Sequence, residues 1–284
     1  MARKEMFFAS GAWGVGNVGD DAIAIGMRRW LGEKLVLMSE HPNKGIRATM
    51  TLEDTLNIVC PGDTFLLGGG GTITDDAVMH AHFLPTARKA KEAGCMLRVS
   101  RMGLEGATGV SANLLKDLFG MCDQITVRSR WSENFVRDHG FYCELWPDYA
   151  LYIPGSGHQE PSYDLLVPKM EADGDEGCQI ALERARTYAT RGERLLIASH
   201  VPFHKANPVM GEADRLKEII ERVDSPLVTG VELTTVGQAL YIYARAKTVI
   251  TGRLHGAFFA HICGVPWGRW DAPSNKVETA YLGE

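Results

Sequence analysis

The chain has 284 residues, of which 45% are hydrophobic and 23% are charged, and its formal net charge at pH 7 is −5. The length exceeds that of a usual single core, so two domains are expected. The acidic balance excludes the basic footprint of a nucleic-acid-binding protein, and any anionic ligand must therefore be held by a local cluster of cations. No apolar run reaches the roughly 20 residues of a membrane span. Six scattered cysteines without a CxxC pair predict a reduced, cytoplasmic protein without a metal framework.

Short apolar runs alternate with helical patterns, which predicts βα units around a parallel sheet. In the first half, strands are expected at residues 5–10, 34–39, 63–67, 95–100, 124–128 and 142–146. Helices are expected between them at residues 20–32, 51–59, 73–93, 111–122 and 130–139. These elements suffice for one doubly wound domain, which we place at residues 1–152.

Residues 153–177 are rich in glycine, proline and acidic residues, which predicts a linker or surface excursion that contains a short strand at most. The alternation then resumes in a second domain, residues 178–284, with strands expected at 194–199, 226–230 and 247–251. Helices are expected at 178–191, 212–223, 233–246 and 255–263. The sequence thus predicts an α/β fold of two parallel-sheet domains facing a cleft, with ligands at the carboxyl ends of the strands.

Arg253 and His255 stand in the middle of a very apolar stretch, "KTVITGRLHGAFFAHIC". The first part is typical of a strand and the last of a helix, so both cations lie in the turn where a helix begins. Free backbone N–H groups and the helix dipole favour anions there, and cations alone would be unfavourable. We therefore expect an anion between Arg253 and His255. The structural alternative is that His255 caps the helix or packs against Phe258 and Phe259.

The segment "GVGNVGDDAI" follows the first strand and contains the GxGxxG spacing of a dinucleotide site at Gly14, Gly16 and Gly19. Glu40 lies where a ribose-binding carboxylate would be expected. Against this reading, Asp20 and Asp21 place negative charge where a pyrophosphate would lie. Those aspartates fit helix capping, or the orientation of a hydroxyl or a cation.

Three further strand ends carry candidate residues. Gly68–Gly71 allow a ligand or another loop to approach the backbone closely. Arg128 ends a predicted strand and can bind carboxylate or phosphate with its forked guanidinium. His200 follows a strand of the second domain and is, with Asp20, a second candidate for moving a proton.

Several of these segments together resemble the polysaccharide pyruvyl transferase family. They are "GVGNVGDDAI", "LLGGGGT", "ITVRSRWS", "PDYAL" and "VITGRLHGAFFAHICGVPW", in an order and spacing similar to the family over most of residues 6–277. The resemblance implies a pair of Rossmann-like domains of the glycosyltransferase-B type. It also implies transfer of a pyruvyl group from phosphoenolpyruvate to two sugar hydroxyls as a ketal, with Arg253, His255 and Arg128 at the donor. Ser129 stands where the family often has Asp.

The candidate catalytic residues are His255, Arg253 and Arg128. The candidate substrate-binding residues are Asn17, Asp20, Gly69, Gly70, Gly71, Leu254, His200 and Lys276. No metal and no cofactor are expected besides phosphoenolpyruvate as donor. The expected partners are a sugar or lipid-linked glycan acceptor, with peripheral association to membrane-bound glycan assembly. The alternatives are a nucleotide-sugar glycosyltransferase of the same architecture, an NAD-dependent oxidoreductase, and an inactive sugar-phosphate-binding relative.

Overall fold

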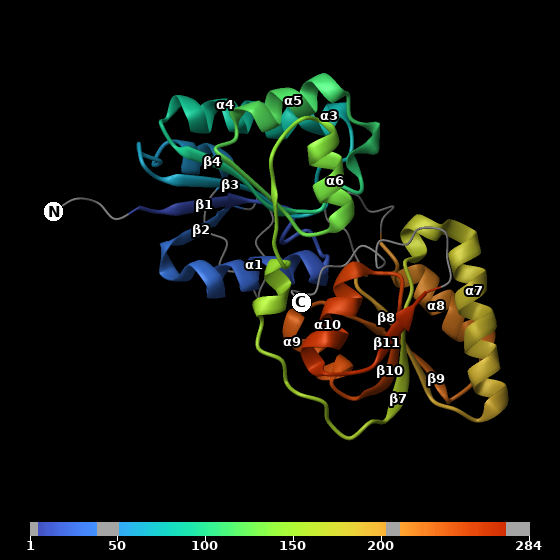
Figure 1. The fold of residues 1–284 in the computed structure, drawn as a ribbon. Helices are drawn as coiled ribbons and strands as arrows, with labels where there is room; N and C mark the ends of the chain where they lie inside the picture. The colour runs from blue at the N-terminus through green and yellow to red at the C-terminus, as the bar shows by residue number, and fades with distance from the viewer. Residues whose placement is uncertain (1–4, 39–50, 203–210, 271–284) are drawn as a thin grey trace. The chain divides into compact units, whose positions relative to one another are not determined.

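The computed structural model of the protein describes residues 5–38, 51–202 and 211–270. These form two compact units (Figure 1). Unit 1 contains the described residues up to Gly14 and Ile23–Tyr152, and unit 2 contains Val15–Ala22 and the described residues from Ile153 onward. The division therefore falls after Tyr152, but the first turn of the first helix is grouped with unit 2.

Unit 1 is built around a parallel sheet whose described strands have the order β2-β1-β3-β4-β5-β6. The strands are β1 (Phe7–Ser10), β2 (Leu35–Met38), β3 (Thr64–Gly70), β4 (Met96–Met102), β5 (Gln124–Val127) and β6 (Glu144–Leu145). Strand β3 lies in the middle and is buried along its whole length, as expected for a parallel strand covered on both faces.

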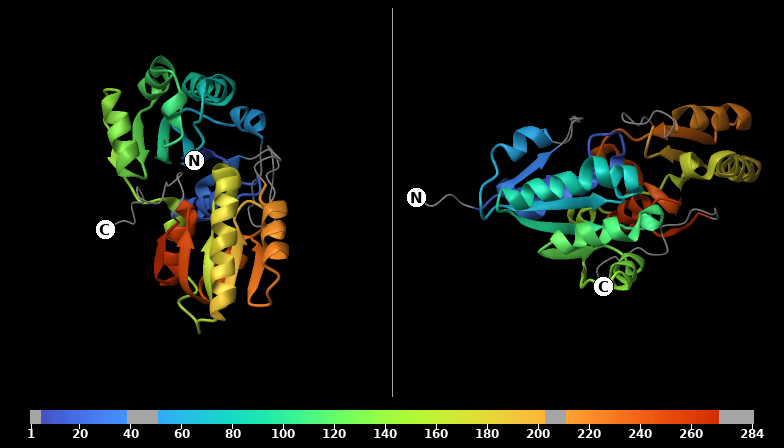
Figure 2. Two further views of the ribbon diagram at one scale, coloured as in Figure 1. Left: turned by 90° about the vertical axis from the view of Figure 1, so that its right-hand side faces the viewer. Right: turned by 90° about the horizontal axis from the view of Figure 1, so that it is seen from above.

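The helices of unit 1 follow the strands in alternation. They are α1 (Val18–Leu31), α2 (Leu52–Leu56), α3 (Asp76–Val78), α4 (Leu84–Glu92), α5 (Ala112–Met121) and α6 (Arg130–Asp138). Helices α4 and α5 cover one face of the sheet and α1 the other (Figures 1 and 2). The long helix expected at 73–93 is interrupted by a π-helical turn, Met79–Phe83, directly before Pro85. Proline cannot donate a backbone hydrogen bond, and α4 accordingly places it in its first turn.

Unit 2 has a second parallel sheet with the order β11-β10-β7-β8-β9 among its described strands. These are β7 (Tyr163–Val167), β8 (Leu195–Ser199), β9 (Val228–Glu232), β10 (Ala246–Thr251) and β11 (Trp267–Arg269). The helices are α7 (Met170–Arg191), α8 (Ala213–Val223), α9 (Val236–Tyr243) and α10 (Leu254–Cys263). Helices α7 and α8 lie on one face of the sheet, and α9 and α10 on the other (Figure 1).

Residues 153–177 are not only a linker, although the short strand expected within them is present. This stretch contains β7, which is the central strand of the second sheet, and the first turns of α7. The apolar "LLV" of β7 is buried between its neighbours β10 and β8, and this tertiary burial outweighs the glycines, prolines and acidic residues on either side. The second unit therefore begins with a complete βα pair.

Candidate functional site

The turn that carries Arg253 and His255 lies at the carboxyl end of β10, as the sequence predicts. Strand β10 ends at Thr251, Arg253 is the N-cap of α10 with extended backbone, and α10 begins at Leu254. The Thr251 hydroxyl accepts a hydrogen bond from the Arg253 amide (3.0 Å) and donates to the Arg253 carbonyl (3.2 Å). These two bonds fix the backbone from which the arginine side chain projects.

Arg253 is ion-paired with a buried glutamate that sequence reasoning missed. Its Nη2 lies 2.8 Å from Oε1 of Glu212, and the two side chains are 9% and 0% exposed. Glu212 stands at the N-cap position of α8. A guanidinium offers a planar fork of donors, so one group can serve a carboxylate and an anion together.

His255 is buried at the start of α10 and packs against two neighbours. Its ring meets Phe258 edge to face, with centroids 5.7 Å apart. On another side, the ring covers Gly19 so closely that a Cβ at that position would overlap the imidazole. The third glycine of the GxGxxG segment is thus explained by close packing on His255, within unit 2. The contact with Phe258 is the one that the structural alternative for His255 anticipated.

His200 lies deep in unit 2, at the end of β8. Its Nε2 is 2.7 Å from the Tyr243 hydroxyl, and its carbonyl accepts a hydrogen bond from the amide of Val18 (3.1 Å). Burial, and next the positive charges of Arg253 and His255, hold the pKa of His200 well below its usual 6.5. A neutral imidazole lacks the acidic proton of an imidazolium, so His200 is a poor proton donor at neutral pH.

Asn17 and Asp20 form the cap of α1. The Asn17 carbonyl accepts from the Asp21 amide and its side-chain oxygen accepts from the Gly19 amide, each within 3.1 Å. The Asn17 amide in turn donates to Asp20 at 2.7 Å. The cap is thus made by the Asn17 side chain, which Asp20 holds in place, and it occupies the Gly19 amide that a pyrophosphate on this turn would need.

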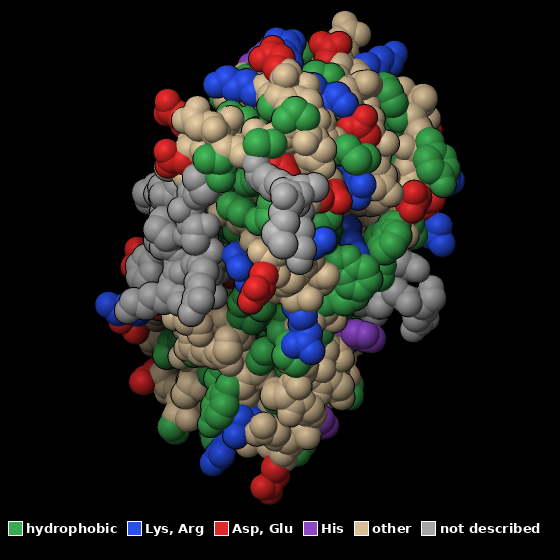
Figure 3. All heavy atoms as spheres, turned by 90° about the vertical axis from the view of Figure 1, so that its left-hand side faces the viewer, with side chains coloured by type: hydrophobic (Ala, Val, Ile, Leu, Met, Phe, Trp, Pro, Cys, Tyr) green, Lys and Arg blue, Asp and Glu red, His purple; other side chains and the backbone are tan. Residues whose placement is uncertain are grey.

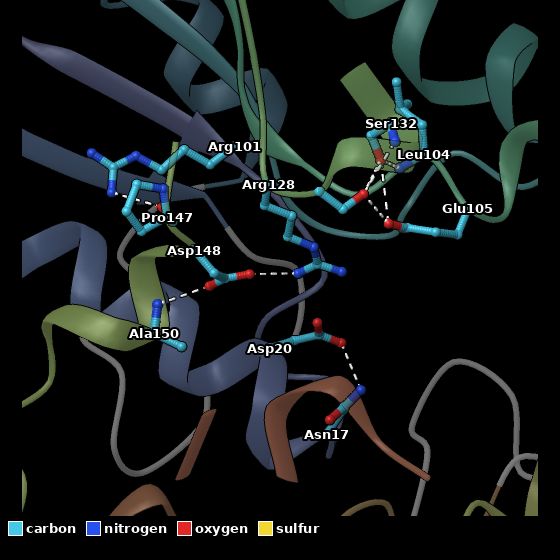
Figure 4. Close-up of polar contacts among 11 residues, drawn as sticks. Asn17, Asp20, Arg101, Leu104, Glu105, Arg128, Ser132, Pro147, Asp148 and Ala150 are labelled. Atoms are coloured by element: carbon cyan, nitrogen blue, oxygen red, sulfur yellow. Dashed lines mark hydrogen bonds and ion pairs between the residues drawn. The ribbon is translucent and has the colours of Figure 1, made fainter. Parts of the chain in front are cut away.

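In unit 1, Arg128 follows β5 and is held by a second buried carboxylate. Its Nη1 lies 2.6 Å from Oδ2 of Asp148, and the side chains are 4% and 1% exposed (Figure 4). Asp148 also accepts from the Ala150 amide at 2.8 Å, which ties it to the turn after β6. Removing two charges from water costs free energy, and the ion pair offsets this cost only while both partners are present. Loss of either side chain is therefore expected to destabilise the folded protein.

Polar side chains surround the start of α6 beside Arg128. Ser129 is the N-cap, and its hydroxyl accepts from the Ser132 amide and donates to Glu105 at 2.5 Å. Serine and aspartate cap helices equally well, so Ser129 performs the local task that Asp would perform at this position. The backbone of Gly103 runs between Glu105 and Arg128, and a Cβ there would lie 2.6–2.7 Å from both side chains.

The remaining predicted substrate-binding residues lie in different settings. Gly69 has φ +82° and lies against the side chains of Ile23 and Trp13 inside unit 1, and Gly70 accepts a hydrogen bond from the Gly103 amide. These glycines allow β3 to pack closely against α1 and β4. Leu254 is a buried first residue of α10. Lys276, like Glu40 of the dinucleotide reading, lies outside the described residues.

Among the residues that the structure describes, no three His, Cys, Asp or Glu side chains are grouped as a metal site would require. No described helix is both long and apolar enough to cross a lipid bilayer. On the face drawn in Figure 3, acidic and basic side chains are interspersed over the coloured residues, in keeping with the net charge of −5.

These observations define a class of protein: an α/β protein with two parallel-sheet domains, each with a buried arginine–carboxylate pair just beyond the carboxyl end of a strand. A family described as "Polysaccharide pyruvyl transferase" matches residues 17–268. The chain belongs to this family, as the resemblance of its motifs predicts.

Solved structures with low sequence identity share the fold. An uncharacterised protein of Klebsiella pneumoniae is 14% identical with a TM-score of 0.55, and the match covers 98% of this chain and 87% of that one. An α-glucosyltransferase solved with UDP and DNA is 10% identical with a TM-score of 0.58, covering 94% and 80%. The UDP-GlcNAc 2-epimerase of Methanocaldococcus jannaschii is 12% identical with a TM-score of 0.57, covering 94% and 83%. No curated protein matches the chain.

Proposed function

We propose that the protein transfers the pyruvyl group of phosphoenolpyruvate to two hydroxyls of a sugar in a cell-surface polysaccharide or its precursor. The product is a cyclic ketal, and inorganic phosphate is released. The observation that carries the proposal is the turn at the start of α10, where buried Arg253 and His255 lie two residues apart in a member of this family. A small molecule with a carboxylate and a phosphate suits an arginine and a histidine so closely spaced better than an extended nucleotide does.

The chemistry requires one proton to be added to carbon and others to be removed from hydroxyls. Protonation of the methylene carbon of phosphoenolpyruvate creates a carbocation stabilised by the phosphate-bearing oxygen. One sugar hydroxyl adds to that centre, the carbon–oxygen bond to phosphate breaks as the leaving phosphate oxygen takes up a second proton, and the second hydroxyl closes the ketal. Each hydroxyl loses its proton as it adds.

The residues of unit 2 can be assigned to these steps. Arg253 binds the anionic donor through charge-assisted hydrogen bonds, and His255 moves protons, since imidazole changes its protonation state near neutral pH. Main-chain amides at the start of α10 favour negative charge at the same place. The role expected of Arg128 at the donor stays a prediction, as do the glycan acceptor, the membrane-bound assembly and the cytoplasmic location.

A phosphate-release assay with phosphoenolpyruvate and a pyruvylatable sugar tests the assignment. His255→Gln keeps some hydrogen bonding but cannot shuttle a proton, so turnover should fall roughly 100-fold while the donor still binds. His261→Gln is the matched control, because His261 is exposed near the end of the same helix. If His255→Gln turns over like wild type at saturating donor, the histidine only packs on Gly19 and Phe258.

The glycosyltransferase alternative rests on the fold shared with the UDP-bound glucosyltransferase. A ligand that binds only the native state raises the unfolding temperature by mass action. Thermal unfolding with phosphoenolpyruvate, UDP, UDP-sugars and NAD therefore separates the donor classes. Stabilisation by phosphoenolpyruvate alone supports the proposal, whereas stabilisation by UDP alone favours the alternative.

A further inference from the structure

Glu212 is a buried carboxylate that joins three separate elements of unit 2. Its Oε1 accepts from the amide of Met170, the first residue of α7, at 2.8 Å. Its Oε2 accepts from the hydroxyl of Ser199, the last residue of β8, at 2.9 Å. The same Oε1 lies 2.8 Å from Nη2 of Arg253, the N-cap of α10.

These contacts leave the carboxylate little freedom. Glu212 is fully buried, and two of the donors just named belong to the regular framework of the unit, one to the backbone of α7 and one to the end of the inner strand β8. Arginine, in contrast, has a long side chain with several rotatable bonds. Its guanidinium can therefore be held in one orientation only by a partner that is itself fixed.

We propose that Glu212 is a positioning residue for the donor site, which it serves by orienting the guanidinium of Arg253 toward an anion at the start of α10. The inference rests on the proposed function, since it assigns Arg253 to the anionic donor. Glu212 lies far in sequence from Arg253 and His255, and it is thereby added to the proposed donor site.

Glu212 has two opposing effects on anion binding, one electrostatic and one through the orientation of Arg253. The carboxylate cancels part of the positive charge of Arg253, so on electrostatic grounds alone its removal should tighten anion binding. If the carboxylate mainly orients the guanidinium, its removal should weaken anion binding, because the fork of donors no longer meets the ligand. The sign of the change separates the two roles.

Calorimetry on the full chain with inorganic phosphate and with phosphoenolpyruvate measures this sign. In Glu212→Gln we expect both anions to bind roughly tenfold more weakly, the loss typical of one charge-assisted hydrogen bond. Glu218→Gln is the matched control, because it removes one negative charge from the same helix α8 at an exposed pair with Arg222 and leaves Glu212 and Arg253 in place. Its anion affinity should stay within about twofold of wild type.

The effects on KM and kcat distinguish a positioning role from a general loss of stability. In the phosphate-release assay, Glu212→Gln should raise KM for phosphoenolpyruvate more than it lowers kcat, since His255 is untouched. Should Glu212→Gln not fold, Arg253→Lys tests the pair from the other side. Lysine keeps the charge but lacks the fork, so it should also weaken binding of both anions.

A small cation tests the pairing without any anion or turnover. In Arg253→Ala, free guanidinium at concentrations far below those that unfold proteins should enter the vacated position and raise the unfolding temperature. The double variant Arg253→Ala/Glu212→Gln should show no such rise, because the carboxylate that holds the ion is gone.

The outcomes are distinguishable. If wild type binds phosphate, Glu212→Gln weakens that binding, and phosphoenolpyruvate is not turned over, the proposed function fails while the positioning role stands. Binding of phosphate by Glu212→Gln that equals or exceeds wild type overturns the positioning role. So does a wild-type protein that binds neither anion.

Discussion

In the folded protein, His200 stays neutral at a pH at which it is protonated in the unfolded chain. Its pKa lies well below 6.5 because of burial first, and then because of Arg253 and His255. The unfolded state therefore binds more protons than the folded state as the pH falls through about 6.5. Folding stability is fully present above that pH and is lost progressively below it.

We predict that the free energy of unfolding of the wild type falls below about pH 6.5, by up to ~1.4 kcal/mol per pH unit from this one group. His200→Gln keeps a hydrogen-bond partner for Tyr243 but cannot titrate, so it should lack this component. Urea unfolding of both proteins between about pH 8 and pH 5 measures the difference. A difference between the two proteins that does not change with pH would contradict the buried, neutral state of His200.

Gly19 and Gly237 are both glycines in α-helices, but their surroundings differ. A methyl group at Gly19 would overlap the ring of His255, whereas one at Gly237 in α9 meets open space. Gly19→Ala should therefore displace His255 and lower turnover in the phosphate-release assay. Gly237→Ala should leave turnover unchanged and stabilise the protein by about 1 kcal/mol, the usual helix preference for alanine. Equal turnover in the two variants would show that the ring can move aside.

At the scale of elements, the order of strands and helices follows from the sequence because parallel βα units have a clear period. The turn from "KTVIT" into "HGAFF" is an example: β10 ends at Thr251 and α10 begins at Leu254, close to the expected bounds. The short strand allowed for in residues 153–177 is present as β7, but its central place in the second sheet was not predicted, because a short apolar run between glycine- and acid-rich stretches carries no period of its own. Its burial comes from β8 and β10, which lie far away in sequence.

The carboxylate partners of Arg128 and Arg253 could likewise not be identified from the sequence. Arg128 and Arg253 stand out because each follows an apolar strand. Nothing local marks Glu212, which precedes an ordinary amphipathic helix, as the partner of Arg253. Asp148 lies in the "PDYAL" segment that contributes to the family resemblance, but its pairing with Arg128 is a tertiary contact. Long-range ion pairs of this kind need the fold before they can be identified.

The Arg128–Asp148 pair ties the end of β5 to the turn after β6, and this predicts a large effect on stability. Asp148→Asn leaves the Arg128 charge buried with a weaker partner, and the loss of one partner in a buried pair costs about 3–5 kcal/mol. Glu218→Gln is the comparison, because its pair with Arg222 on α8 is exposed and contributes below about 1 kcal/mol. Urea unfolding measures both. A loss for Asp148→Asn no larger than that for Glu218→Gln would show that water reaches the pair.

At the scale of the whole molecule, the first helix contributes residues to both units. Residues Val15–Ala22 are grouped with unit 2, although α1 continues in unit 1 from Ile23. The contacts of the first turn explain this grouping: Val18 donates its amide to the carbonyl of His200, and Gly19 packs on His255. A segment early in the chain thus packs, within unit 2, on the turn that carries Arg253 and His255.

Native-state hydrogen exchange tests this division, because an amide exchanges when the cooperative unit that protects it opens. Leu195→Ala removes a buried side chain from the core of unit 2, and Leu97→Ala does so in unit 1, each at a cost of about 2–5 kcal/mol. We predict that Leu195→Ala speeds exchange of the Val18 amide and leaves that of Met27, further along the same helix, nearly unchanged. Leu97→Ala should have the opposite pattern. If both amides respond to the same substitution, α1 opens as one body and its first turn does not belong to unit 2.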